Sequence, residues 1–426
     1  MWVLALPEVS FASVGLDCAA QLCLKYTKYA ARSSKVKLLV VGCGQCGGRI
    51  ADEFALMSKA ARAERGMDVL TNAIAVNTDM ADLSGLSHIQ SDYLHRVLIG
   101  ARKTGGHGVG KINELGAELA REDGDKILES INATESFTET DAFLIIAGAA
   151  GGTGSGAIAV LTQILKERFR EKPVYNLIAL PFRHEERTEE RCILNVGTCL
   201  KSTYLVADAI FLVDNQRYIE RNLAIRNNLA RINRVAVRPF YDLLCAGEET
   251  DARYVGSRVL DAGDVIETLT GWTAIGYGKV KASRIKLPGE DKLHFRDKMG
   301  KTQKGVQAMD DAISQLSLKC NVRDVRKALY LLTGPAEEMS LDLIKELSSS
   351  LKNIAAEAVI RSGDYPRGRG SLAVTLVLSD LVNARKIMEY FSRTIDLIYL
   401  ARRRRGVTDY EHKGIGEAFN DIPSLL

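Results

Sequence analysis

The chain has 426 residues, of which 46% are hydrophobic, so it is long enough for two domains or for one large α/β domain with an appendage. Its 57 basic and 53 acidic residues give a net charge of +4, so the overall charge points neither to a nucleic acid nor to an anionic membrane as a partner. The eight scattered cysteines do not resemble a secreted disulfide framework, and we expect a cytoplasmic protein.

Residues 1–34 are moderately apolar, but Glu8, Asp17 and Lys25 interrupt them and no basic segment precedes them. A membrane-spanning helix needs about 20 uninterrupted apolar residues, and a signal peptide begins with basic residues. Neither pattern is met, so we expect no transmembrane segment. We treat residues 1–34 as an N-terminal extension of open status, either an extra helix or the result of an upstream start that is not the physiological one.

A first strand, expected at 36–41, runs into the segment Gly42-Cys43-Gly44-Gln45-Cys46-Gly47-Gly48 and then into a helix at about 49–63. The spacing G-x-G-x-x-G matches the dinucleotide-binding fingerprint, which is a weak signal on its own. Cys43 and Cys46 form a C-x-x-C without the second pair that a zinc site requires, so we expect neither metal binding nor redox chemistry there.

The next strand, expected at 73–76, ends in the polar residues Asn77-Thr78-Asp79. Their amide, hydroxyl and carboxylate groups suit contacts with a phosphate, a sugar or a hydrated Mg²⁺ ion. Asp79 also stands near the position where a dinucleotide-binding fold places an acid that holds a ribose. An NAD-binding oxidoreductase of the Rossmann type therefore stays an alternative.

A further glycine-rich segment, Gly105 to Gly110, follows a short apolar run at 97–99. Its His107 fits a hydrogen-bond donor or a turn residue better than a catalytic base, because no Ser or Cys nucleophile motif accompanies it. A polar amphipathic helix is expected over 111–131.

The most informative segment is Gly151-Gly152-Thr153-Gly154-Ser155-Gly156, which lies between an expected buried strand at 142–147 and an expected helix over 157–169. Glycine N–H groups and the partial positive charge of a helix N-terminus together form an anion site. We therefore expect a phosphate cradle here. The alternative is that these glycines serve only the close packing of helix against strand.

Two more strands are expected at 173–181 and 208–213, and the second ends in Asp214-Asn215. The charged segment 185–191 between them is expected to be a solvated loop. Strands that alternate with helices indicate an α/β fold with a doubly wound, mostly parallel sheet, which binds ligands at the carboxyl ends of its strands.

A long helix over 222–246 carries Asn233, a polar residue among apolar neighbours. Beyond it, Asp261 and Asp264 lie three residues apart at an expected boundary between a loop and a helix. Capping of the helix N-terminus explains one such aspartate but not both.

The last part of the chain predicts a second, smaller α/β domain and a C-terminal helix. Helices are expected at 299–313 and 340–360, strands at 326–333 and 371–379, and the final helix at 381–405, where it ends in four arginines. The expected division is an extension at 1–34, a nucleotide-binding domain at 35–221, a central helix with an acidic loop at 222–265, a second domain at 266–380, and a C-terminal helix with a short tail at 381–426.

Taken together, these motifs occur in the order and at the approximate spacing of the tubulin/FtsZ superfamily. The motifs are Gly42 to Gly48, Asn77-Thr78-Asp79, Gly151 to Gly156, Asp214-Asn215, Asn233, and Asp261 with Asp264. Gly44 to Gly47 looks like tubulin, and Ala75 to Asp79 looks like FtsZ. Gly106 to Gly110, followed by Asn113 to Gly116, is most similar to the archaeal CetZ group. The resemblance covers about residues 36–400.

The resemblance implies a GTPase that binds GTP or GDP with Mg²⁺ and assembles with itself, head to tail, into protofilaments. The residues it implies for the nucleotide are Gly44, Gln45, Cys46, Gly47, Asn77, Asp79, Gly106, His107, Gly108, Gly151, Gly152, Thr153, Gly154, Ser155, Gly156, Glu185, Arg191, Asn215 and Asn233. Of these, Gln45 would approach Mg²⁺ indirectly, Glu185 and Arg191 would approach the ribose, and Asn215 and Asn233 would contact the guanine.

The resemblance also implies that Asp261 and Asp264 are catalytic, because they match the acidic loop that reaches the nucleotide of the neighbouring subunit. Hydrolysis would then be activated by polymerisation. Two positions depart from the family pattern: Val259 replaces an asparagine that is usual in FtsZ, and Leu229 replaces an aromatic residue that often stacks on the base. An assembling nucleotide-binding scaffold with little hydrolysis is therefore a further alternative.

The resemblance to CetZ proteins favours a role in cell shape, with cell division as the other option, by analogy alone. Neither a long acidic tail like that of tubulin nor a C-terminal peptide like that of FtsZ is recognisable. A contact of the C-terminal region with a membrane or an adaptor is conceivable, but the sequence does not support one.

Overall fold

The computed structural model describes residues 36–281, 295–368, 370–404 and 419–426, so the extension expected at 1–34 lies outside the described residues. In the described part of the chain, ten strands form one sheet. Across the sheet they lie in the order β3 (Arg96–Leu98), β2 (Leu70–Asn77), β1 (Leu38–Cys43), β4 (Ala142–Gly148), β5 (Val174–Leu180), β6 (Ala209–Asp214), β7 (Gly271–Val280), β10 (Leu372–Leu381), β8 (Val325–Pro335) and β9 (Val359–Arg367).

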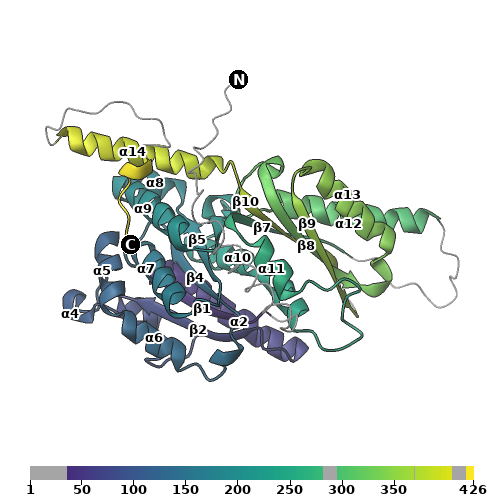
Figure 1. Ribbon diagram of the computed structural model, residues 1–426, viewed down its shortest axis with the longest axis horizontal. Coiled ribbons are helices and arrows are strands. Elements are labelled where there is room, and N and C mark those ends of the chain that lie inside the picture. Colours follow the sequence, from purple (N-terminus) through teal and green to yellow (C-terminus); the bar gives the residue numbers. More distant parts are fainter. Residues whose placement is uncertain (1–35, 282–294, 369, 405–418) are drawn as a thin grey trace, which may run out of the picture.

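Helices cover both faces of this sheet (Figure 1), as a parallel sheet requires because its strands are apolar on both sides. The α-helices of the described residues are α2 (Gly44–Arg65), α3 (Met80–Ser84), α4 (Ala101–Thr104), α5 (Asn113–Glu122), α6 (Gly124–Asn132), α7 (Thr153–Arg168), α8 (Arg183–Thr188), α9 (Glu190–Val206), α10 (Ile225–Glu248), α11 (Ala262–Thr268), α12 (Phe295–Ser314), α13 (Leu341–Ile354) and α14 (Arg385–Arg404).

Strand β1 illustrates how the two faces are built. All six of its residues are buried, and successive side chains point to opposite faces. Leu38 and Val40 join the core on the side of α2 and α10, whereas Leu39 and Val41 join the core on the side of α5, α7 and α9. Such a strand can only be central, which fixes β1 in the middle of the parallel region.

Three phenylalanines pack together between α2, α10 and the face of the sheet that these helices cover. The ring of Phe240 on α10 lies 5.2 Å from that of Phe54 on α2 and 5.2 Å from that of Phe211 on β6, in edge-to-face geometry each time. The same core includes Leu329 of β8 and Val377 of β10, so α10 packs against both halves of the molecule.

The strand direction changes in the second half of the sheet. Strand β10 pairs antiparallel with both β7 and β8, whereas β8 and β9 are parallel. Because β7 also pairs in parallel with β6, one sheet runs through both halves. The predicted class is confirmed: an α/β fold with a doubly wound, mostly parallel sheet, a long connecting helix and a smaller second α/β part. The proposed domain limits stay a prediction.

Several expected helix limits were wrong. Helix α2 begins at Gly44 rather than near residue 49, and α7 begins at Thr153 rather than near 157, because the glycines form the first helical turn and not a loop. The single helix expected over 111–131 is divided into α5 and α6. At the division, the carboxylate of Asp123 accepts a hydrogen bond from the backbone N–H of Gly100 at 2.6 Å.

The segment 185–191 is not a loop, because α8 and the start of α9 occupy it. Helix α9 escaped prediction because much of its buried face consists of small polar residues in place of an apolar stripe. The hydroxyls of Thr198, Ser202 and Thr203 each donate to the backbone carbonyl four residues earlier, which satisfies them inside the core.

The helix expected over 340–360 was also wrong, since α13 ends at Ile354 and residues 359–367 form β9. This strand contains Gly363, Asp364 and Pro366, residue types that are depleted in strands. Its place at the edge of the sheet permits them.

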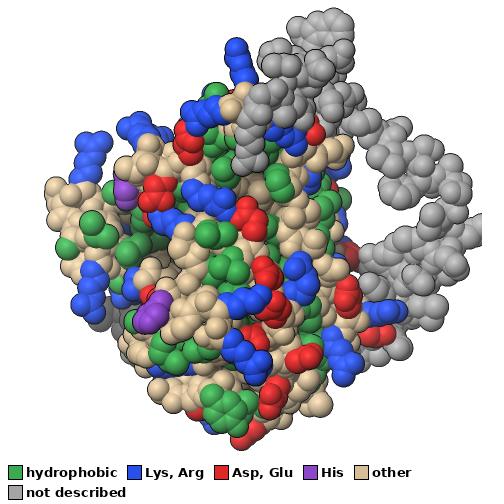
Figure 2. Space-filling view, turned by 90° about the vertical axis from the view of Figure 1, so that its left-hand side faces the viewer, with side chains coloured by type: hydrophobic (Ala, Val, Ile, Leu, Met, Phe, Trp, Pro, Cys, Tyr) green, Lys and Arg blue, Asp and Glu red, His purple; other side chains and the backbone are tan. Residues whose placement is uncertain are grey.

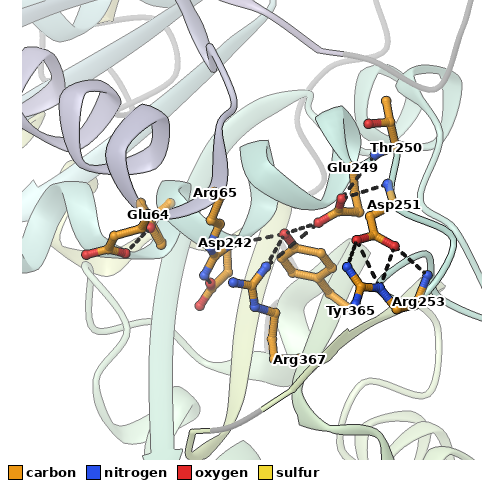
Figure 3. A network of polar contacts seen from close by, with 10 residues as sticks. Glu64, Arg65, Asp242, Glu249, Thr250, Asp251, Arg253, Tyr365 and Arg367 are labelled. Atoms are coloured by element: carbon orange, nitrogen blue, oxygen red, sulfur yellow. Dashed lines mark hydrogen bonds and ion pairs between the residues drawn. The ribbon is translucent and has the colours of Figure 1, made fainter.

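A buried polar network joins the two halves beside α10 (Figure 3). Arg65, at the end of α2, forms an ion pair of 2.9 Å with Asp242 of α10, and their side chains are only 9% and 2% exposed. Arg65 also donates to the hydroxyl of Tyr365 on β9 at 3.3 Å. Tyr365 in turn donates to Glu249 at 2.9 Å, just beyond the end of α10. The network therefore links α2, α10 and β9.

Residues 419–426 pack against α9 and α14. Lys201 of α9 donates to the carbonyl oxygen of Ile422 at 2.5 Å, and the hydroxyl of Ser202 accepts from the backbone N–H of Leu425 at 2.9 Å. The side chains of Ile422 and Leu425 are buried, so this short segment belongs to the folded core.

The face that Figure 2 shows carries basic and acidic side chains interspersed, so charge is not separated by sign on this side of the molecule. Among the helices of the described residues, none combines the length and the apolar composition needed to cross a lipid bilayer.

The Asp242→Asn substitution tests the buried network. It should lower the free energy of unfolding by about 3–5 kcal/mol, because it leaves the buried guanidinium of Arg65 without its counter-charge. Urea denaturation followed by circular dichroism measures the change. Glu389→Gln, which breaks the exposed pair of Arg385 and Glu389 on α14, is the control and should have little effect. Equal effects of the two substitutions would contradict a structural role for this network.

Candidate functional site

A pocket of about 440 Å³ lies at the carboxyl ends of β1, β2, β4, β5 and β6. We call it the glycine pocket. The predicted residues that line it are Gly44, Gln45, Cys46, Asn77, Asp79, Gly108, Gly151, Gly152, Thr153, Gly154, Glu185, Asn215 and Asn233. The predicted residues that do not line it are Gly47, Gly106, His107, Ser155, Gly156, Arg191, Asp261 and Asp264. Segments that are far apart in the sequence thus converge on one pocket.

The glycines around this pocket have two different tasks. A Cβ atom on Gly154 would lie 2.6 Å from the carbonyl oxygen of Cys43, and one on Gly156 would overlap the carbonyl oxygen of Asn113, so these two positions are glycine because backbones meet there. A Cβ atom on Gly151 would meet nothing within 4 Å. The packing explanation therefore holds for Gly154 and Gly156, whereas Gly151 faces open space in the pocket.

Two helix N-termini point into the pocket, those of α2 and α7. Gly44 and Cys46 line it from the first turn of α2, and Thr153 and Gly154 line it from the first turn of α7. Neither first turn contains an acidic residue, so nothing within these turns offsets the partial positive charge of the exposed N–H groups. An anion is the ligand that this arrangement favours.

Asn195 of α9, which the sequence did not single out, holds the glycine loop in place. Its side-chain amide donates to the carbonyl oxygens of Lys111, Ala150 and Gly151 at 2.9–3.0 Å, and the side chain is fully buried. Replacing it would remove the hydrogen bonds that tie the carbonyls of Lys111, Ala150 and Gly151 to one side chain. The signal that could have found it is an asparagine in the first turns of a helix that faces the glycine segment.

A second unpredicted residue, Asp82 of α3, organises the polar side of the pocket. Its carboxylate accepts from the amide of Gln45 at 2.6 Å and from the amide of Asn77 at 3.1 Å. Asp79 caps α3 by accepting from the backbone N–H of Asp82 at 3.1 Å. The acidic residue was visible three positions after Asp79, but only the fold shows that it turns back toward Gln45.

The segment around His107 docks onto the strand end that carries Asp79. The N–H of Gly108 donates to the carbonyl of Thr78 at 3.1 Å, and the N–H of Met80 donates to the carbonyl of Gly106 at 3.0 Å. His107 itself is exposed and lies outside the pocket lining.

The opposite side of the pocket is formed by the ends of β5 and β6 and by α10. The side-chain amides of Asn215 and Asn233 are half-buried, and neither has a hydrogen-bond partner among the described residues. Glu185 accepts from the N–H of Phe182 at 2.8 Å, which fixes its carboxylate at the start of α8. Phe182, Ile225 and Leu229 add apolar side chains to this side.

Arg191 lies next to the pocket and not in its lining. Its guanidinium pairs with Glu114 and donates to the carbonyl oxygen of Lys111 at 3.3 Å. Lys111 lines the pocket and pairs with Glu189 at 2.6 Å. The cations on this side are thus held by carboxylates of α5 and of the segment before α9.

The predicted carboxylates lie toward the amino ends of the parallel strands, where Asp261 directly precedes α11 and Asp264 lies within it. Asp261 caps this helix by accepting from the N–H of Asp264 at 2.7 Å. A second cavity, of about 540 Å³, includes Gly263 of α11 together with Pro173, which directly precedes β5. Since Pro181, directly after β5, lines the glycine pocket, the seven residues of β5 separate the two sites by about 20 Å.

The C-x-x-C motif does not form a reactive pair. Burial raises the pKa of Cys43 to about 12 and that of Cys46 to about 11, so both thiols are protonated at neutral pH. Within the described ranges, no group of three or more His, Cys, Asp or Glu side chains is placed to hold a metal ion.

Comparison with known proteins identifies the class to which this fold and site belong. Residues 37–222 match the Tubulin/FtsZ family, GTPase domain, and residues 223–396 match the Tubulin-like CetZ, C-terminal domain. Tubulin-like protein CetZ1 of Haloferax volcanii is 32% identical over 368 residues, which cover 83% of this chain and 90% of that protein. Tubulin-like protein CetZ of Pyrococcus abyssi is 28% identical over 388 residues, which cover 90% and 94%. The chain belongs to the tubulin/FtsZ family and, within it, to the CetZ group.

Solved structures agree with this assignment. CetZ1 from Haloferax volcanii, a GDP-bound monomer, has a TM-score of 0.73 and 29% identity over 85% of this chain and 100% of that one. CetZ2 from the same organism, a protofilament with bound GTPγS, has a TM-score of 0.71 and 28% identity over 86% and 100%. The family resemblance inferred from the motifs is therefore confirmed, and it favours a GTPase over the NAD-dependent oxidoreductase.

The raised pKa of Cys46 can be tested by alkylation. An ordinary thiol becomes reactive as the pH approaches 9, whereas Cys46 should react with iodoacetamide only as the pH approaches 11. Mass spectrometry of the peptide that contains Cys46, after timed labelling at a series of pH values, measures the rate. The urea-unfolded chain is the control and should show the ordinary pH dependence. A Cys46 that is labelled fully at pH 8 in the folded protein would contradict the raised pKa.

Proposed function

We propose that the chain binds GTP in the glycine pocket and hydrolyses it after head-to-tail self-assembly, when α11 of one subunit reaches the pocket of the next. The observation that carries the proposal is the distance of about 20 Å between the glycine pocket and α11, because no side chain of α11 spans it within one subunit. The related CetZ2 forms a protofilament with bound GTPγS, which supports self-assembly with a bound guanine nucleotide.

The phosphates would lie between the N-termini of α2 and α7. The backbone N–H groups from Gly151 to Gly154 would donate to them, and Gln45 and the segment of Gly108 would close the sides. The hydroxyl of Ser155 already donates to the carbonyl oxygen of Gly151, so Ser155 would hold the loop instead of touching the ligand.

Mg²⁺ fits the oxygen-rich side formed by Gln45, Asn77, Asp79 and Asp82. These groups suit a hydrated ion held through water and phosphate oxygens, and when bound the ion would offset the charge that develops on the phosphates. Asp82 would keep Gln45 and Asn77 oriented toward it.

The base would lie against the other side of the pocket. Asn215 and Asn233 offer amide donors and acceptors that have no partner among the described residues, and these would recognise the edge of a guanine. Glu185 would accept from a ribose hydroxyl, with Arg191 behind it. Leu229 stands at the position of the family's stacking aromatic.

Asp261 and Asp264 would be supplied to the nucleotide of the neighbouring subunit and polarise the attacking water. A head-to-tail contact that does not close on itself produces a filament. The product would be a cytoplasmic filament with a role in cell shape or division. Val259, which is 41% exposed where FtsZ usually has an asparagine, favours a scaffold with slow hydrolysis as the second candidate.

A mixing experiment tests whether the two halves of the site come from different subunits. In the donor variant, Gly151→Trp fills the pocket but leaves α11 intact. In the acceptor variant, Asp264→Asn keeps the pocket but removes one carboxylate. Each variant alone should release no phosphate from GTP, whereas the mixture should hydrolyse GTP, because donor carboxylates meet acceptor nucleotides.

Gly151→Ala is the matched control. Its added methyl group meets no protein atom within 4 Å and takes up far less of the pocket than an indole, so this variant should fold and keep GTP hydrolysis that the Gly151→Trp variant loses. Phosphate release, together with sedimentation of the mixture, measures the outcome. An acceptor that hydrolyses GTP alone at the unmodified rate, or a folded mixture that sediments together without hydrolysis, would refute the shared site. In the second case the slow scaffold becomes the better account.

A further inference from the structure

The carboxylate of Asp264 is not free in this subunit, because an arginine from the edge strand β9 holds it. One guanidinium nitrogen of Arg361 contacts Asp264, and the other contacts Glu267. The three side chains are 26–35% exposed, so the cluster is neither deeply buried nor fully solvated. Asp264 and Glu267 stand three residues apart and share one face of α11, where their like charges would repel each other without a cation between them.

Only an arginine suits this geometry. Its planar guanidinium presents two N–H groups side by side, and each can point at a different carboxylate, whereas a lysine offers a single compact charge. The two N–H groups of the guanidinium therefore set the direction of the Asp264 side chain, and their positive charge balances its negative charge. Asp261 differs, since its carboxylate caps the helix and is exposed.

Strand β9 also holds the segment that leads into α11. The carboxylate of Asp364 accepts from the backbone N–H groups of Ser257 at 2.9 Å and of Arg258 at 2.6 Å. The N–H of Asp364 donates back to the carbonyl of Arg258 at 3.0 Å. The segment before α11 is thus bonded to β9 by its backbone.

The far end of α11 is held by the neighbouring strand. Lys327 of β8 donates to the carbonyl oxygen of Glu267 at 2.7 Å and to the hydroxyl of Thr270 at 2.9 Å. A cation at the C-terminal end of a helix is favourable. The sheet of the second half of the molecule therefore fixes α11 at both ends.

We propose that Arg361 is a positioning residue for the GTPase reaction: it holds the Asp264 carboxylate in the direction in which α11 presents it to the nucleotide of the next subunit. This inference rests on the proposed function. It predicts that Arg361 acts only in the subunit that supplies the carboxylates and has no part in holding the nucleotide of its own subunit.

The donor and acceptor variants show in which of the two subunits Arg361 acts. Arg361→Gln is added either to the Gly151→Trp donor or to the Asp264→Asn acceptor, and phosphate release by each mixture is measured. In the donor it should lower kcat by about 10- to 100-fold, as expected for a misdirected catalytic group. In the acceptor it should leave kcat unchanged, and GTP binding by the acceptor should stay the same.

Two further variants complete the test. Arg361→Lys in the donor should restore part of the rate, because it keeps the positive charge but lacks the two side-by-side N–H groups. This variant also replaces Arg361→Gln in the test if Arg361→Gln does not fold. Arg326→Gln, which changes a 67% exposed arginine of β8, is the matched control and should have no effect.

An unchanged rate with Arg361→Gln in the donor, or equal losses in donor and acceptor, would overturn the positioning role while leaving the proposed function intact. A mixture that never hydrolyses GTP, even with Arg361 present, would overturn the proposed function and the positioning role with it.

Discussion

The common direction of strands β1 to β7 is the constraint on which the rest of the structure depends. The carboxyl ends of parallel strands lie on one side of the molecule, and their amino ends lie on the other. The glycine pocket lies at the carboxyl ends, and α11 adjoins the amino ends. A strand of seven residues is therefore enough to keep the two parts of the proposed active site apart, and self-assembly becomes the way to unite them.

Close backbone contact determines the shape of the pocket. Gly154 touches the chain at Cys43, and Gly156 touches it at Asn113, so α7 settles against β1 and α5 at distances that no side chain would permit. The same contacts bring the N-termini of α2 and α7 together. Packing and ligand binding are thus not competing explanations for the glycine segment, because the packing forms the cradle.

The sequence allowed prediction of the pocket but not of what supports it. Strands with apolar runs and glycine motifs at their carboxyl ends identify the fold and the glycine-rich side of the pocket, because local pattern and topology agree there, and the family resemblance adds Glu185, Asn215 and Asn233. Helix α9 and strand β9 were not predicted. The hydroxyls of Thr198 and Ser202 donate to backbone carbonyls of their own helix, so polar residues replace an apolar stripe there. The carboxylate of Asp364 accepts from the backbone N–H of Arg258, which is distant in the sequence. Asn195, Asp82 and Arg361 act through partners far away in the chain, and only the folded structure brings those partners together.

The measurement that tests the central claim most directly is GTP turnover per subunit over a dilution series, with sedimentation of the same samples in GTP, GDP and a slowly hydrolysed analogue. If the site is completed by a neighbouring subunit, turnover per subunit should be close to zero in dilute samples and rise at the concentration where the protein begins to sediment. GTP and the analogue should promote sedimentation, and GDP should not. Turnover per subunit that stays constant across the dilution series, in a protein that remains monomeric, would contradict the account.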